Sequence, residues 1–292
     1  MVRFSPARIL CPIDFSEHSA AALRMAGSLA RAFGAEVRVL HAQRFEAPIY
    51  FTSAQLQALN TQLRRSLRSA RKFVENFTAQ HLPEDVARSV RVVEQEPVEA
   101  ILRMHKEWRA DLLVMGTHGR TGLTRIRLGS VMESVFRQVR SPILTVGPDA
   151  RVPPVGPIRR VLSPIDFSAM SRETFQCAVD LAERTNAEVI AVHILEGPPE
   201  GHDEQAVSAL CDWVSPQARA RCTVREVVRE GTPPERIVAE AKASRADLIV
   251  LGARPRSYLG GLVFGSTTEE VIRTAPCPVL SIIQRPSRAA AK

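Results

Sequence analysis

The 292-residue chain repeats itself, and this repeat constrains the fold more than any other feature of the sequence. Residues 8–16 (RILCPIDFS) recur 152 positions later as residues 160–168 (RVLSPIDFS). Residues 110–116 (ADLLVMG) recur as residues 246–252 (ADLIVLG), but here the offset is only 136 positions. The difference indicates a deletion of 16 residues inside the second copy. The sequence therefore predicts two copies of one domain, each large enough to bury its own core.

Apolar runs alternate with helical patterns in both copies. The runs contain successive Val, Ile and Leu residues, which is typical of strands covered on both faces in a parallel sheet. In the first copy we expect strands near 8–13, 36–42, 86–93, 111–115 and 142–146, and helices near 17–33, 52–80, 97–109 and 130–139. In the second copy we expect strands near 159–164, 188–194, 221–228, 247–251 and 278–283, with a shorter second helix within 200–218.

This alternation predicts an α/β chain made of two tandem, doubly wound, five-stranded parallel-sheet domains of the Rossmann-like, nucleotide-binding type. Ser16 is expected to cap the first helix, and Gly34 to end it in a left-handed conformation. We expect the first domain at 1–149, a proline-rich linker at 150–157, the second domain at 158–285 and a tail at 286–292.

The composition is that of an ordinary globular protein, with 45% hydrophobic and 24% charged residues. The longest apolar stretches are too short to span a bilayer, and the first ten residues lack the apolar core of a secretory signal, so we expect a cytoplasmic protein. The five cysteines and seven histidines show neither a disulfide framework nor zinc-ligand spacing. Cys11, which ends the first expected strand, is interpreted as a small buried apolar residue.

The formal net charge of +8 lies almost entirely in the first half of the chain. Residues 1–150 carry 21 basic and 14 acidic side chains, whereas residues 151–292 carry 18 and 17. A basic first domain is compatible with an anionic ligand. Nucleic acid is the competing explanation, but aromatic residues make up only 5% of the chain and do not alternate with the arginines as in a single-strand binding platform. We therefore expect no nucleic-acid partner and interpret most arginines as solvated helix faces.

Residues suited to ligand binding follow the expected strands of the first domain. In open α/β sheets, ligands bind beyond the carboxyl ends of the strands. In the first domain these ends carry Pro12, Ile13, Asp14, His41, Ala42, Met115 and Gly116. A glycine-rich loop then runs from Gly116 to Ser130.

This loop has the features of a phosphate cradle. Its glycines allow positive φ angles and let an anion approach main-chain N–H groups. Gly129 and Ser130 then open a helix, whose first N–H groups attract phosphate. Ser130 is expected to cap this helix and to donate its hydroxyl to a phosphate, while Asp14 is suited to a ribose hydroxyl or an adenine edge. The loop matches neither a Walker nor a dinucleotide motif, so the residues alone leave both a phosphate site and a structural turn open.

A family resemblance favours the phosphate site. The spacing Gly116-x2-Gly119-x9-Gly129-Ser130 is similar to the ATP-binding signature of the universal stress protein family. Residues 12–16 resemble the first-strand motif of that family, as does His41 at the end of the second strand, and the likeness covers nearly the whole chain. The resemblance implies that ATP, with or without Mg²⁺, is bound by Pro12, Ile13, Asp14, Ala42, Met115, Gly116, Gly119, Gly129, Ser130 and Val131.

The second copy departs from this signature. Pro255 replaces the second glycine, and because proline has no N–H and fixes φ, the loop cannot follow the same path there. Two interpretations stay open, a second nucleotide site or a structural partner of the first domain. The matching residues for a second site are Asp166, Ile194, Gly252, Gly265 and Ser266.

Three functions are compatible with the sequence. The first is a non-enzymatic, ATP-binding stress-response module; the others are a slow ATPase and a nucleotide-independent scaffold or chaperone-like protein. No catalytic or metal-binding residues are expected, and His118 is interpreted as an exposed loop residue. The resemblance also implies that Ile143–Val146 and Val279–Ile282 pair within the chain. A homodimer and an unidentified protein partner are left open.

Overall fold

The structure, a computed structural model, describes residues 3–43, 53–117, 128–152, 156–196, 203–253, 256–258, 261–263 and 265–283. Several expected features lie outside these residues: Gly119 and His118 in the first glycine-rich loop, Pro255 in the second, and the tail at 286–292.

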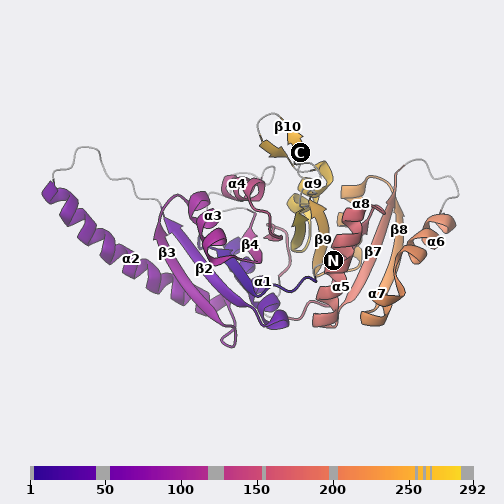
Figure 1. Cartoon of the computed structure of the whole chain (residues 1–292), viewed down its shortest axis with the longest axis horizontal. Coiled ribbons are helices and arrows are strands. Elements are labelled where there is room, and N and C mark those ends of the chain that lie inside the picture. The colour runs from indigo at the N-terminus through magenta and orange to yellow at the C-terminus, as the bar shows by residue number, and fades with distance from the viewer. Residues whose placement is uncertain are drawn as a thin grey trace, which may run out of the picture.

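The first copy follows the expected alternation of strands and helices (Figure 1). Its elements are β1 (Arg8–Pro12), α1 (Glu17–Phe33), β2 (Glu36–Gln43), α2 (Ser53–His81), β3 (Arg88–Glu94), α3 (Pro97–Trp108), β4 (Leu112–Gly116), α4 (Ser130–Gln138) and β5 (Ile143–Val146).

The second copy repeats this order with local differences. Its elements are β6 (Arg160–Ile165), α5 (Ala169–Thr185), β7 (Glu188–Leu195), α6 (Asp203–Trp213), α7 (Pro216–Arg221), β8 (Val224–Glu230), α8 (Pro233–Ala243), β9 (Leu248–Ala253), β10 (Arg256–Tyr258), β11 (Gly261–Val263), α9 (Ser266–Thr274) and β12 (Val279–Ile283).

Two expectations for the second copy were inaccurate. The single short helix within 200–218 is two helices, α6 and α7, because Ser215 caps a new helix whose first residue is Pro216. The following strand begins at Val224 instead of near 221, since α7 runs to Arg221. The hairpin of β10 and β11, in the loop before α9, was not expected.

All strands of the described residues except β10 and β11 form one ten-stranded sheet with the order β3-β2-β1-β4-β5-β12-β9-β6-β7-β8. Each copy contributes five parallel strands, which confirms the predicted fold class. The two halves join where β5 pairs antiparallel with β12. The expected pairing of the final strands within one chain is therefore confirmed, and each covers the edge that the other would otherwise expose.

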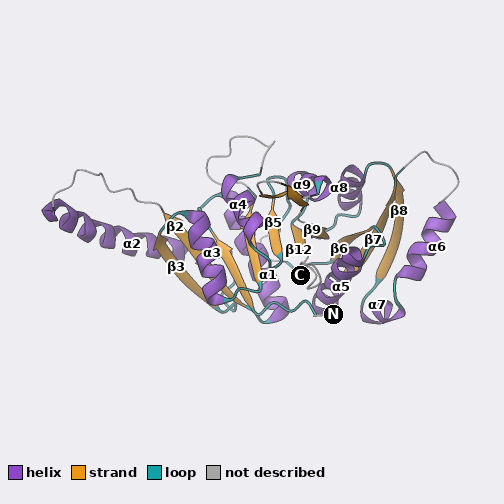
Figure 2. Cartoon of the chain, turned by 45° about the horizontal axis from the view of Figure 1, so that its top comes forward, coloured by secondary structure: helices purple, strands orange, loops and turns teal. Residues whose placement is uncertain are grey.

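Helices cover both faces of this sheet, so that each copy is doubly wound (Figure 2). One apolar core contains side chains of α1, α2, α5, α6 and α7. The other contains side chains of α3, α4, α8 and α9. Both cores run through the two copies, because β5 and β12 place the halves edge to edge.

Helix α1 shows how local sequence sets the start and end of an element. The Ser16 side chain accepts a hydrogen bond from the N–H of Ser19, and Gly34 ends the helix at φ 70°, both as expected. The small buried residues between them, mostly alanine, let α1 lie close to the sheet. In the second copy, Ser168 caps α5 in the same way, and Asn186 takes the left-handed position of Gly34.

Candidate functional site

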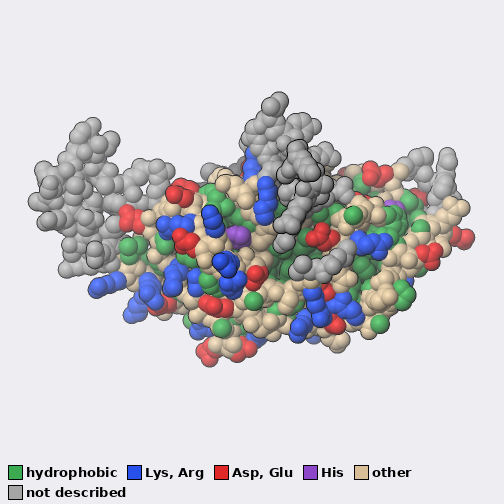
Figure 3. Space-filling view, in the orientation of Figure 1, with side chains coloured by type: hydrophobic (Ala, Val, Ile, Leu, Met, Phe, Trp, Pro, Cys, Tyr) green, Lys and Arg blue, Asp and Glu red, His purple; other side chains and the backbone are tan. Residues whose placement is uncertain are grey.

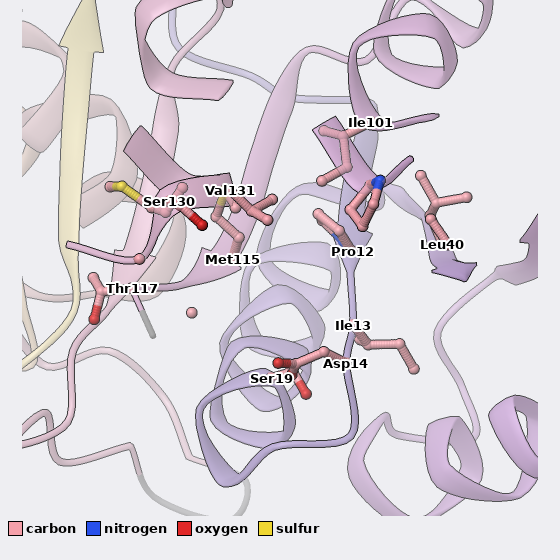
Figure 4. A pocket seen from close by; sticks show the side chains of 15 residues that line it. Pro12, Ile13, Asp14, Ser19, Leu40, Ile101, Met115, Thr117, Ser130 and Val131 are labelled. Atoms are coloured by element: carbon pink, nitrogen blue, oxygen red, sulfur yellow. The ribbon is translucent and has the colours of Figure 1, made fainter. Parts of the chain in front are cut away.

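A cavity of about 260 Å³ lies at the carboxyl ends of β1, β2 and β4. The strand order of the first copy reverses between β1 and β4, the usual place for a ligand site in such a sheet. Figure 4 shows side chains from these strand ends, from α3 and from the start of α4 arranged around it. The expected site residues that line it are Pro12, Ile13, Asp14, Ala42, Met115, Gly116, Gly129, Ser130 and Val131. The tenth, Gly119, lies outside the described residues.

Other residues that line the cavity were not expected from the sequence. Pro97 and Ile101 of α3 form one wall, and Leu40, Ser19, Thr117 and Met132 complete the set. The repeat contains a signal for the α3 wall: Pro97 and Ile101 correspond to Pro233 and Ile237, which line the equivalent cavity of the second copy. Both copies have proline and isoleucine at these two positions after their third strand, and this repetition could have indicated a shared role.

The first residues of α4 line this cavity. Its N-cap is Gly129, which has no side chain to accept a hydrogen bond from the first turn. The expectation that Ser130 caps α4 was therefore wrong: Ser130 is the first helical residue, one position too late for its hydroxyl to reach those N–H groups. Ser130 is exposed and lines the cavity. Its hydroxyl therefore lies beside the helix start, where a ligand could reach it.

Thr117 holds the two ends of the glycine-rich loop together. Its carbonyl oxygen accepts a hydrogen bond from the N–H of Gly129 at 2.8 Å, and its own N–H donates to the carbonyl of Val146 at 2.9 Å. Residues 118–127 between these ends lie outside the described part of the chain. The start of α4 is thus fixed against the ends of β4 and β5.

Asp14 lies in the turn between β1 and α1, on the rim of the cavity. Its Oδ1 accepts hydrogen bonds from the N–H and the hydroxyl of Ser16, at 3.1 and 2.6 Å. Met115 and Ile101 are almost fully buried and form apolar walls. The arrangement combines a carboxylate, an apolar wall and a helix start, which suits a ligand with a flat apolar ring, hydrogen-bond donors and an anionic group.

The second copy has an equivalent cavity of about 500 Å³. Asp166, Ile194, Gly252 and Gly265 line it, and Ser266 follows Gly265 as the first residue of α9. These five candidates are therefore brought together. As in α4, the N-cap glycine leaves the first turn of α9 without a side-chain cap.

The two cavities differ in the side chains that line them. Ile194 takes the place of Ala42, and Thr267 and Thr268 take the places of Val131 and Met132. Thr268 donates its hydroxyl hydrogen to the carbonyl of Gly252 at 3.0 Å. The two threonines make the second cavity more polar than the first, and its volume is also the larger of the two.

Met170 covers part of the backbone that lines the second cavity. A Cβ added at Gly252 would lie 2.4 Å from the Cγ atom of Met170, so this side chain packs directly on the glycine backbone. The residue at the same position of the first copy is His18. Close approach of a ligand to the backbone at Gly252 would require Met170 to move.

The remaining candidate chemistry is limited. Cys11 is fully buried in the core, as expected, and burial raises the pKa of its thiol. Among the described residues, no group of three or more His, Cys, Asp or Glu side chains is placed to hold a metal ion. No described helix combines the length and apolarity needed to cross a membrane.

Figure 3 shows basic side chains interspersed with acidic ones over this face of the first copy, so they form no continuous positive surface there.

Comparison with known proteins gives a consistent result. The model of the universal stress protein family matches residues 7–147 and, a second time, residues 157–282. A universal stress protein of Mycolicibacterium smegmatis is 25% identical over 95% of this chain and 97% of the relative. One of Mycobacterium tuberculosis is 31% identical over 63% of this chain, and the match spans 65% of that relative's length, slightly less than two thirds.

A solved structure shares the complete architecture. The crystal structure of a universal stress protein from Archaeoglobus fulgidus superimposes with a TM-score of 0.71, covering 97% of this chain and all of the other. The two sequences are 22% identical, so this likeness concerns the fold.

Proposed function

Because this chain belongs to the universal stress protein family, we propose that it is a cytoplasmic stress-response protein that binds ATP in the cavity of its first copy. We propose further that it acts without catalysing a reaction, and that bound nucleotide changes the surface it offers to a protein partner.

One observation carries this proposal: residues far apart in sequence meet in one cavity. The end of β1, the end of β4 and the start of α4 each contribute two or more of the residues that the sequence motif implies. A structural turn would not need a carboxylate, an apolar wall and an uncapped helix start to converge there.

The parts of ATP would find complementary groups in this cavity. The adenine ring would lie against Met115, Ala42 and Ile101, which are apolar. Asp14 would accept a hydrogen bond from a ribose hydroxyl or the adenine amino group. The phosphates would lie at Gly129 and Ser130, where the N–H groups of α4 and its positive dipole end attract anions.

A magnesium ion would be held mainly by the phosphates. No described acidic cluster could bind the ion by itself, and Mg²⁺ commonly uses phosphate oxygens and water as ligands. The second copy would bind ATP much more weakly although its cavity is larger, because Met170 packs on Gly252 and Ile194 places a bulkier side chain where the first copy has Ala42. We therefore expect about one ATP per chain.

The experiment is titration calorimetry with ATP on the purified full chain and on the variant Ser130→Asp. A carboxylate in the first turn of a helix stabilises the helix but repels phosphate, so this variant should stay folded and bind ATP at least about tenfold more weakly. Adenosine, which lacks phosphate, should bind both proteins about equally.

The matched control is Ser266→Asp, the same change at the first residue of α9. It should leave the affinity and the single equivalent of ATP unchanged. A fall from two equivalents to one would show that the second copy also binds ATP. Absence of binding by the wild-type chain at millimolar ATP would overturn the proposal and favour a nucleotide-independent scaffold, and steady phosphate release sensitive to Ser130→Asp would favour the slow ATPase.

A further inference from the structure

The side chain of His41 helps to hold the turn that carries Asp14. The Nδ1 atom of His41, on β2, lies 3.0 Å from the carbonyl oxygen of Ile13, the residue before Asp14. The His41 ring also packs against the ring of Phe15, the residue after Asp14, with centroids 4.6 Å apart. Because a carbonyl oxygen can only accept, Nδ1 of His41 is the donor. His41 therefore contacts both neighbours of Asp14, although it is not among the described residues that line the cavity.

Phe15 needs such contacts because its backbone is strained. Its φ angle is 65°, in the left-handed region that bulky side chains rarely adopt. Residues in this region persist when surrounding contacts hold them there. Besides His41, the Phe15 ring contacts Phe73 and Phe77 of α2, with centroids 4.8 and 5.4 Å away. The turn is thus held between β2 and α2.

The carboxylate of Asp14 is oriented by this turn. Its Oδ1 is bound by the N–H and hydroxyl of Ser16, the residue that also caps α1. The backbone on either side is held through Ile13 and Phe15. Loss of the His41 contacts would allow the peptide planes around Asp14 to rotate, and the carboxylate would move with them.

The second copy contains the same arrangement. Nδ1 of His193 lies 2.7 Å from the carbonyl oxygen of Ile165, and its ring lies 4.5 Å from that of Phe167, whose φ angle is 58°. Asp166 is bonded by the N–H and hydroxyl of Ser168. The geometry therefore occurs twice at equivalent positions, although the helices packed beside Phe15 and Phe167 differ.

We propose that His41 is a positioning residue of the first-copy site, which directs the Asp14 carboxylate towards the nucleoside part of the ligand. This inference rests on the proposed function. It adds that the nucleoside and phosphate parts of ATP are bound by separately held groups: Asp14, fixed through His41, and the start of α4, fixed through Thr117. A change at His41 should therefore weaken nucleoside binding and leave phosphate binding intact.

Two variants separate the contacts of His41. His41→Phe keeps an aromatic ring beside Phe15 but removes the hydrogen bond to Ile13. His41→Asn keeps a donor close to the position of Nδ1. Titration calorimetry with ATP, adenosine and tripolyphosphate should show that His41→Phe weakens ATP and adenosine about tenfold and leaves tripolyphosphate unchanged. His41→Asn should recover most of the lost affinity.

The control is His193→Phe, which removes the same contacts in the second copy. It should lower the thermal midpoint about as much as His41→Phe does but leave the ATP affinity unchanged. A loss of ATP affinity in His41→Phe alone then reports positioning of Asp14 and not a general loss of stability. A double-mutant cycle tests the route through Asp14: in an Asp14→Ala background, His41→Phe should have no further effect on adenosine affinity.

The outcomes separate this inference from the proposed function. If the wild-type chain binds no ATP, both fail. If it binds ATP, the inference alone is overturned by any of three results: unchanged adenosine affinity in His41→Phe, an equal loss of tripolyphosphate affinity, or additive effects of Asp14→Ala and His41→Phe. Should His41→Phe fail to fold, the same comparison between the three ligands is made with His41→Gln, whose longer side chain places its amide nearer the position of Nε2 than of Nδ1. An unchanged adenosine affinity, or an equal loss for all three ligands, then overturns the inference.

Discussion

Leu144 and Leu280 face each other at the centre of the antiparallel pair between β5 and β12, and they are the same position of the two copies. On either side, Ile143 lies opposite Ser281 and Thr145 opposite Val279. Because Val279 is the equivalent of Ile143 and Ser281 that of Thr145, each of these residues lies opposite the equivalent of the other, as in a two-fold symmetric interface. A single chain therefore contains the type of contact by which two identical subunits associate.

This symmetry makes a prediction about stability. Leu144 and Leu280 are both fully buried, so Leu144→Ala and Leu280→Ala should each lower the free energy of unfolding by about 2–5 kcal/mol. The two losses should be similar, and because the residues are in contact, the double variant should deviate from their sum. Urea unfolding followed by circular dichroism measures all three values. A neutral effect of either single change would contradict the burial of that leucine, and strictly additive losses would contradict the contact between the two.

A second prediction concerns the N-terminal segment, which crosses to the other copy and lies beside α5 (Figure 1). The buried Asp180 of α5 accepts hydrogen bonds from the N–H of Phe4 at 2.7 Å and from Arg221 at 2.6 Å. Asp180→Asn weakens both bonds and should cost about 1–3 kcal/mol in urea unfolding. Glu183→Gln, at a much more exposed partner of Arg221 and Arg3, is the control and should have little effect. Equal losses would mean that burial of Asp180 does not matter.

The pH dependence of stability should include a contribution from His105. Its Nε2 lies 2.6 Å from the hydroxyl oxygen of Ser141, and burial lowers its pKa below the usual 6.5. The unfolded chain therefore binds more protons than the folded one in this range. Stability from neutral His105 is present above pH 6.5 and is lost as the pH falls through the lowered folded-state pKa. His105→Gln should reduce the slope of unfolding free energy against pH below 6.5, and an unchanged slope would argue against this.

The difference between the two cavities can be tested by exchanging one side chain. Ala42→Ile introduces the residue found at the second copy and should weaken ATP binding about tenfold, because the larger side chain occupies space beside Met115. Ile194→Ala makes the reverse change and should raise the affinity of the second cavity. Calorimetric stoichiometry measures both. Ile194→Ala combined with Met170→Ala should approach two equivalents of ATP, and a constant single equivalent would show that other residues exclude it.

Much of the site could be predicted from sequence because its residues lie at the ends of strongly patterned elements. Asp14 directly follows a run of apolar residues, and Gly116 ends another. Chain order and the parallel arrangement then bring these ends to one edge of the sheet. Pro97 and Ile101 were missed because they lie in the first two turns of α3, a helix that crosses over the sheet, where the pattern indicates only a helix start and burial.

What the sequence by itself determined is the repeat, the alternation of strands and helices, and the identity of the residues at the strand ends. These follow from hydrophobic period and turn chemistry, which act between neighbours in the chain. Only the tertiary structure decided that Gly129 and not Ser130 caps α4, that His41 holds both neighbours of Asp14, and that Phe4 bonds to Asp180. Such contacts join residues up to 176 positions apart, and they depend on how packed elements meet in space.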